Sequence, residues 1–276
     1  MIYLIVATVL FSLSFGLIRS QLVSLPSEFV VFARLLIATL IFIPFLKKIN
    51  FKKQFIAFII GIIQFGVMYL CFIKAFRYLQ GNEAALLTTS TPVFVAIWSM
   101  FLGEKFKPIY IACILMSVIG AIIVVWHNIS FNMIVKGVLL MESSNCAFAL
   151  GQVLWKKYLG KDDLKLMASA YLGAVIFVTP FALMNVNLLS IKVSLAQILS
   201  ILYLAVIPTG IGFWLWNKGS ASVKYSTLAV MNNLKIPLGV LFSILLFHER
   251  VNIVNFSIGS TIILLAIILL HFCLKK

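Results

Sequence analysis

The chain has 276 residues, of which 63% are hydrophobic and only 11% are charged, and its mean hydropathy is +1.15. Soluble domains contain about 45–50% apolar and about 25% charged residues, so this composition excludes a soluble globular protein. The net charge of +15 does not indicate a nucleic-acid partner either, because the basic residues are distributed between apolar runs as membrane topology requires.

Ten apolar stretches follow one another along the chain. They cover about residues 2–18, 27–46, 54–76, 83–101, 108–126, 133–154, 164–184, 196–216, 224–246 and 252–273. Crossing a hydrocarbon layer of about 30 Å takes roughly 20 residues in a helix, because lipid offers backbone groups no partner except one another. Since the alternation of a β-barrel is absent, we expect an all-α integral membrane protein with ten transmembrane helices. The first stretch lacks the flanks of a signal peptide, so we expect it to be retained.

The basic residues are divided unevenly between alternate connections. Of the 22 lysines and arginines, 14 fall on one side of the expected bundle and 6 on the other. The positive-inside rule then predicts that both termini are cytoplasmic, in the inner (plasma) membrane of a bacterium. The remaining two, Arg34 and Lys235, lie inside apolar stretches.

The sequence contains no pattern typical of nucleotide binding or of a catalytic nucleophile. The four cysteines, which lie within or at the ends of apolar stretches, have no paired spacing that would indicate a disulfide framework or a metal site. We therefore expect no metal, no cofactor and no enzymatic activity.

An internal repeat relates the fourth and ninth stretches. Residues 84–105 read AALLTTSTPVFVAIWSMFLGEK, and residues 229–250 read AVMNNLKIPLGVLFSILLFHER, so that Pro92 matches Pro237 and Glu104 matches Glu249. The pattern predicts a duplication, with a first five-helix repeat over residues 1–127 and a second over 128–276. Because five is odd, the second repeat enters the membrane from the opposite side. Inverted repeats of this kind are typical of secondary transporters, whose substrate site lies near the midplane.

The stretch KAFRYLQGNEAALLTTSTPVFVAIWSMFLGEK, residues 74–105, resembles the signature of the EamA-type drug/metabolite transporters, and residues 218–250 resemble its second copy. The resemblance implies ten helices in two inverted groups of five, with a central cavity lined by the first four helices of each group. It also implies that the fifth and tenth helices serve packing or dimerisation. The second copy departs from the pattern, because Phe247-His248 stands where the first has Leu102-Gly103.

Pro92 and Pro237 interrupt their helices and are expected to act as hinges or kinks. A proline removes one backbone donor and clashes with the carbonyl four residues earlier, here that of Thr88 or Asn233. Such a carbonyl is tolerated in a membrane only against protein or a wet cavity. A kink that serves packing alone remains the alternative.

Three ionisable side chains lie deep in the expected helices: Lys235, Arg34 and Glu142. A charged group facing lipid at this depth costs at least about 2.5–3.5 kcal/mol, so each must face protein or water. In the family's arrangement their helices all border the cavity, and we expect the charges to converge there. Alternatively, Glu142 neutralises Lys235 or Arg34 in a structural pair, although one acid against two bases leaves a positive surplus.

Polar and aromatic neighbours extend this candidate substrate site. Asn232 precedes Lys235 by three residues, and Asn145 follows Glu142 by one turn. Tyr69 and Gln64 lie deep in the third stretch and are further candidates for lining the pocket. Trp155 and Trp216 fall at the cytoplasmic ends of their stretches, where interfacial belt residues are expected.

A base for a carboxylate and an acid for an amine predict a small zwitterion as substrate, an amino acid or a close derivative. We expect a secondary transporter that works by alternating access, in contact with membrane lipids, with protons or a counter-substrate as coupling partners and a possible homodimer through the fifth and tenth helices. Alternatives are a transporter of a nucleoside-linked metabolite such as S-adenosylmethionine, a transporter of cationic amines or drugs, and a membrane-embedded enzyme. The buried bases disfavour a cationic substrate.

Overall fold

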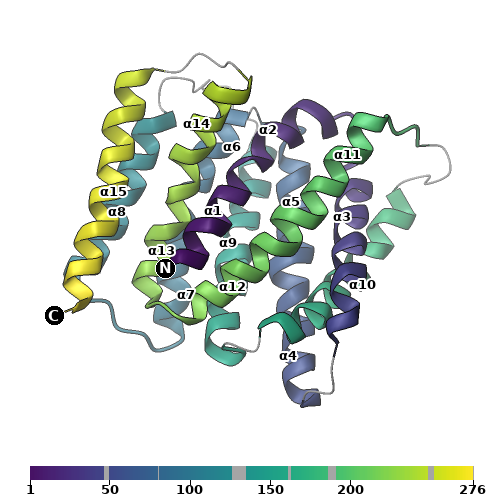
Figure 1. The fold of residues 1–276 in the computed structure, drawn as a ribbon, viewed down its shortest axis with the longest axis horizontal. Coiled ribbons are helices and arrows are strands. Elements are labelled where there is room, and N and C mark those ends of the chain that lie inside the picture. Colours follow the sequence, from purple (N-terminus) through teal and green to yellow (C-terminus); the bar gives the residue numbers. More distant parts are fainter. Residues whose placement is uncertain are drawn as a thin grey trace.

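The computed structural model describes residues 1–46, 50–79, 81–125, 135–160, 163–185, 191–247 and 252–275. Within these ranges every regular element is helical, which confirms the all-α expectation for the described part of the chain. Figure 1 shows long helices packed side by side, with consecutive stretches running in alternating directions through the bundle.

The elements up to the middle of the chain are α1 (Ile2–Ser12), α2 (Ser14–Leu17), η1 (Ile18–Leu22), α3 (Ser27–Phe42), η2 (Ile43–Phe45), α4 (Phe51–Gly61), η3 (Ile62–Val67), α5 (Met68–Ala75), α6 (Gly81–Thr88), α7 (Thr91–Phe101) and α8 (Pro108–Val125). The remaining elements are α9 (Val135–Tyr158), α10 (Asp163–Asn185), α11 (Leu195–Leu204), η5 (Ala205–Gly212), α12 (Phe213–Ala221), α13 (Tyr225–Met231), η6 (Asn232–Leu234), α14 (Lys235–Phe247) and α15 (Ile253–Lys275).

Each apolar stretch marked in the sequence overlaps a helix or a run of helical segments. Among the described residues, six of these runs are long and apolar enough to cross a membrane: Ser27–Phe45, Phe51–Ala75, Glu83–Phe101, Leu164–Met184, Leu195–Ala221 and Ile253–Cys273. The predicted boundary between residues 127 and 128, and the Glu249-Arg250 end of the second repeat copy with His248, lie outside the described residues.

Several stretches are not uniform α-helices. Wide π-helical turns occur in η1, η3 and η5, and η6 is a tight 3-10 turn. In η5 the ring of Pro208 removes a backbone donor, which favours an irregular turn. Insertions of this kind are frequent at functional sites, and here each adjoins a residue that lines the pocket described below.

The two repeat prolines lie next to breaks in their helices. α6 ends at Thr88, and Pro92 occupies the first turn of α7. The carbonyl of Thr88 accepts a hydrogen bond of 2.8 Å from the Thr91 hydroxyl, so the break leaves that oxygen satisfied. In the other half, η6 separates α13 from α14, in which Pro237 is the third residue.

Glycines allow close helix contacts, as is usual where lipid provides no hydrophobic drive for association. α10 packs against α4, and α8 packs against α15 at one side of the bundle (Figure 1). A Cβ atom on Gly61 would lie 1.9 Å from the carbonyl oxygen of Ala170, and one on Gly259 would lie 2.3 Å from that of Gly120. The helices α8 and α15, which correspond to the fifth and tenth apolar stretches, therefore pack on each other within one chain through Gly120 and Gly259.

Replacing Gly61 with alanine should destabilise the protein, because the added methyl group would collide with the α10 backbone. Overpacking of this kind costs about 1–3 kcal/mol. We expect a lower melting temperature in detergent for Gly61→Ala. The control Gly239→Ala, whose methyl group would approach only the Ser12 carbonyl at 3.6 Å, should melt at or slightly above the wild-type temperature. Identical melting of Gly61→Ala and wild type would contradict the close contact.

Candidate functional site

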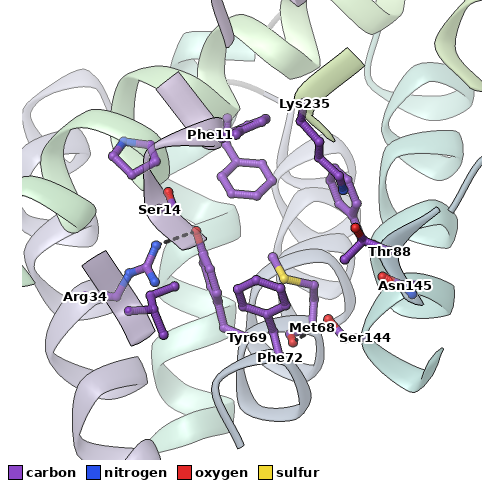
Figure 2. Close-up of a pocket in the computed structure, with 14 residues that line it drawn as sticks. Phe11, Ser14, Arg34, Met68, Tyr69, Phe72, Thr88, Ser144, Asn145 and Lys235 are labelled. Carbon is purple, nitrogen blue, oxygen red and sulfur yellow. Dashed lines mark hydrogen bonds between the residues drawn. The ribbon is translucent and has the colours of Figure 1, made fainter. Parts of the chain in front are cut away.

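A pocket lies inside the bundle, with an empty volume of about 570 Å³ that includes its open mouth (Figure 2). It is lined by Phe11, Ser14, Ile18, Arg34, Met68, Tyr69, Phe72, Thr88, Ser144, Asn145, Phe148, Pro208, Phe213 and Lys235. These residues come from both halves of the chain, and most of them are apolar or aromatic. The two charged members, Arg34 and Lys235, are both cations, and no described residue of the lining is acidic.

Arg34 is fixed by two hydroxyl groups and one aromatic ring. Its Nη2 donates to the Tyr69 hydroxyl at 3.1 Å and to the Thr209 hydroxyl at 2.9 Å, and these two hydroxyls are 2.9 Å apart. The guanidinium carbon also lies 4.4 Å from the centre of the Tyr69 ring. Thr209 is held in turn, because its backbone carbonyl accepts a hydrogen bond from Tyr171.

The sequence of α3 explains why this guanidinium is buried. Arg34 shares its helix face with Val30, Val31 and Ala38, which are fully buried, and helical spacing carries the arginine inward with them. Only 1% of Arg34 is exposed, and its Nε and Nη1 have no hydrogen-bond partner in the described structure. A buried cation with two unused nitrogens and no carboxylate beside it is a strong attractor for an anion.

Lys235 contributes a second cation on the other side of the pocket. In Figure 2 its side chain and that of Arg34 lie on opposite sides, with Phe11, Met68 and Phe72 between them. The Lys235 ammonium lies 5.7 Å from the centre of the Phe148 ring, a cation–π contact. Among the described residues it has no hydrogen bond or ion pair, so its donors are available to a ligand.

Glu142 does not join the two bases. Its carboxylate accepts a hydrogen bond of 2.7 Å from the Ser90 hydroxyl, and it is not part of the pocket lining. Asn145 does line the pocket, and its amide donates to the Leu87 carbonyl at 2.9 Å and to Ser90 at 3.1 Å. The sequence predicted that three charges converge in the pocket. The structure brings the two cations to it, whereas Glu142 of α9 bonds to Ser90 at the break between α6 and α7.

Gln64 and Asn232 lie outside the pocket, in a separate layer of buried amides. Gln64 donates to Asn217 at 3.0 Å, and Asn232 donates to Gln152 at 3.2 Å and to the Leu228 carbonyl at 2.8 Å. The indole of Trp216 also donates to Gln152, at 3.0 Å.

The two tryptophans assigned to an interfacial belt are in fact core residues. Trp155 is 0% exposed and Trp216 is 2% exposed. The correction has a simple cause. Both fall on helix faces that meet other helices, and a position near a helix end does not reveal which way a side chain points.

Aromatic rings close the pocket on the side of the amide layer. Phe213 packs against Phe65 at 5.0 Å, Phe148 at 5.7 Å and Phe11 at 4.7 Å between ring centres. Phe65 precedes Tyr69 by four residues, and Phe213 follows Thr209 by four. These rings, which we call the aromatic floor, therefore lie one helical turn from the Arg34 cluster. Beyond this floor, towards the start of α4 and the end of α9, lies the amide layer.

Thr209 is a site residue that the sequence analysis missed. Its signal was a hydroxyl between Pro208 and Gly210 in an otherwise apolar helix. The aromatic lining from Phe11, Phe148 and Phe213 had no such signal, because phenylalanine is common along the chain, with 24 copies in total.

Removing the Thr209 hydroxyl should destabilise the protein, because it would deprive the buried guanidinium of a partner. A hydrogen bond to a charged group contributes about 1.5–3 kcal/mol. We expect Thr209→Val to melt at a lower temperature than wild type. The control Thr39→Val removes an equally buried hydroxyl that bonds only a carbonyl of its own helix and should change the melting temperature much less. Equal effects of the two substitutions would argue against a special role for Thr209.

Comparison with known proteins gives a consistent result. The EamA-like transporter family matches residues 1–126 and 135–272. A probable biotin transporter of Pseudomonas aeruginosa is 31% identical over 269 residues, which cover 95% of this chain and 94% of that protein. A biotin transporter of Salmonella typhimurium is 30% identical over 271 residues, covering 96% of this chain and 90% of that protein.

A solved crystal structure supports the fold. It is similar to this chain with a TM-score of 0.81 and covers 99% of this chain and 96% of its own. The sequence identity is 16%, so this likeness concerns the arrangement of helices alone.

Proposed function

Since this chain belongs to the EamA-like transporter family, we propose that it is a secondary transporter that moves a small organic carboxylate across the bacterial inner membrane. The observation that carries the proposal is the buried guanidinium of Arg34, which has unused donors and no acidic partner among the described residues. Biotin, the substrate named for the relatives from Pseudomonas and Salmonella, is our first candidate.

The charge of the pocket favours an anionic substrate. Burying an unpaired cation costs several kcal/mol, and a carboxylate brought by the substrate offsets that cost. With Arg34 and Lys235 both in the lining, a bound monocarboxylate still leaves one positive charge. The pocket therefore repels cationic amines and drugs, which we reject as substrates.

The shape of the lining favours a carboxylate with an apolar body. Between the two cations lie Phe11, Met68 and Phe72, which offer an apolar surface (Figure 2). Biotin combines a carboxylate, a hydrocarbon chain and a neutral ring that carries a carbonyl oxygen. We assign its carboxylate to Arg34 and its ring carbonyl to the ammonium of Lys235.

An amino acid fits the pocket less well. Its amine needs an acceptor, and the sequence-based proposal gave that role to Glu142. Because Glu142 is bonded to Ser90 and is absent from the lining, the described residues of the pocket offer an amine no carboxylate. Transport of an amino acid or of S-adenosylmethionine thus remains the second candidate, and it would require Glu142 to turn towards the pocket.

We further propose ten membrane crossings in two inverted halves, residues 1–127 and 128–276, with both termini cytoplasmic. The double match of the family to residues 1–126 and 135–272 supports this division. In the proposed orientation the aromatic floor and the amide layer separate the pocket from the cytoplasm. Alternating access would open this floor, with the helix breaks near Pro92 and Pro237 as hinges.

Replacing Arg34 with glutamine should abolish most biotin transport. Loss of a charge-assisted contact of about 2–5 kcal/mol corresponds to a fall of more than about tenfold in transport efficiency. The measurement is uptake of labelled biotin by proteoliposomes, with insertion checked by protein content. Glu142→Gln serves as the control and should transport biotin nearly as well as wild type. Full transport by Arg34→Gln would refute the assignment, and loss of transport in Glu142→Gln alone would favour the zwitterion.

Replacing Lys235 with methionine should weaken recognition of the ring rather than of the carboxylate. We therefore expect the affinity for biotin to fall about tenfold, as loss of one hydrogen bond from a charged donor implies. The affinity for nonanoate, a carboxylate of similar length without a ring, should hardly change. Competition against labelled biotin measures both. If both ligands weaken equally, Lys235 acts through the overall charge and does not read the ring.

A further inference from the structure

A second cavity, with an empty volume of about 510 Å³ that includes its open mouth, lies at the end of the bundle where α7 and α9 end and α8 and α13 begin. Three lysines line it, from three separate segments of the chain: Lys105 after α7, Lys156 in α9 and Lys224 before α13. Glu104 is the acid among the described residues of the lining. The lining thus carries a surplus of two positive charges, and none of the transport residues discussed above belongs to it.

The lysines outnumber the one acid that the described lining offers them. Within the described part of the chain, none of the three makes an ion pair, although Glu104 lines the same cavity. Lys156 lies over the ring of Tyr225, with its ammonium 4.9 Å from the ring centre. Tyr225 and Tyr110, both mostly buried, add aromatic surface and hydroxyl groups to the lining. Ammonium and hydroxyl donors that converge from separate segments suit a tetrahedral oxyanion.

The position of the cavity indicates a lipid as the source of that anion. Four helix termini meet at this level, which is where a bilayer has its headgroups. Beside the cavity, Phe101 and Ile109 expose 78% and 43% of their surfaces, and such apolar surface suits acyl chains. In the orientation proposed above, this end faces the cytoplasmic leaflet.

We propose that this cavity binds the phosphate of an anionic phospholipid headgroup, with Lys105, Lys156 and Lys224 as its ligands. Basic pockets between helix ends are a recognised form of anionic-lipid site. A headgroup that also carries an amine would bring its own positive charge against the lysines, so a phosphatidylglycerol-type headgroup is favoured over phosphatidylethanolamine. The site is independent of which substrate the transporter carries.

The test is lipid binding to the purified full-length protein, measured by native mass spectrometry with added phosphatidylglycerol or phosphatidylethanolamine. The variant changes Lys105, Lys156 and Lys224 to glutamine. The matched control changes Lys52, Lys53 and Lys165, three lysines of the same end that do not line the cavity, so that the total charge is equal. Glu104→Gln is a third variant, which removes the acid and leaves every lysine in place.

We expect the cavity variant to lose at least about tenfold in phosphatidylglycerol affinity while the control keeps wild-type binding, and Glu104→Gln to bind more tightly than wild type. Equal loss in the two triple variants would overturn the proposal, because it would indicate attraction to the charged surface in general. Unchanged binding by Glu104→Gln would overturn it as well, even if the cavity variant failed to fold. Displacement of the lipid by millimolar inorganic phosphate would assign the cavity to a soluble phosphate compound instead.

Discussion

The guanidinium of Arg34 lies inside a membrane bundle without a carboxylate beside it in the described structure, and the architecture around it follows from that constraint. Two hydroxyls, from Tyr69 and Thr209, satisfy one of its nitrogens, and the Tyr69 ring covers its face. These contacts hold the group in place without cancelling its charge. A carboxylate of the protein in place of these two hydroxyls would have neutralised the guanidinium of Arg34. No positive charge would then have remained there for an anionic substrate.

The side chains around this charge form three successive layers along the helix axes. The pocket carries the cations, the aromatic rings of Phe65, Phe148 and Phe213 close it on one side, and the amides of Gln64, Gln152 and Asn232 lie beyond them. Several amide atoms in that layer have no hydrogen-bond partner among the described residues. A floor made of ring contacts and under-satisfied amides costs less to open than a packed aliphatic core, because water can take up the free groups.

Much of this could be predicted from the sequence. Hydropathy located the helical stretches to within a few residues, and the rarity of charges in lipid singled out Arg34 and Lys235. Depth along a helix is readable in this way, whereas contacts between helices are not. Asn232 shares a face with Lys235 but lies one turn lower, where its short amide bonds to Leu228 and Gln152. Gln64 turns away from the pocket and bonds to Asn217, and Glu142 bonds to the Ser90 hydroxyl at the α6–α7 break.

The substrate prediction also changed because it depended on a contact between helices that the sequence does not reveal. A zwitterion required the acid to reach the pocket, and the contact with Ser90 removes that half of the argument while leaving the carboxylate half intact. The most direct test of the account changes the ligand and leaves the protein untouched, by comparing the binding of biotin and of its neutral primary amide to the purified transporter. The account predicts that biotin binds at least about tenfold more tightly than the amide. Equal affinities for the two would show that no buried cation recognises a carboxylate and would contradict the account.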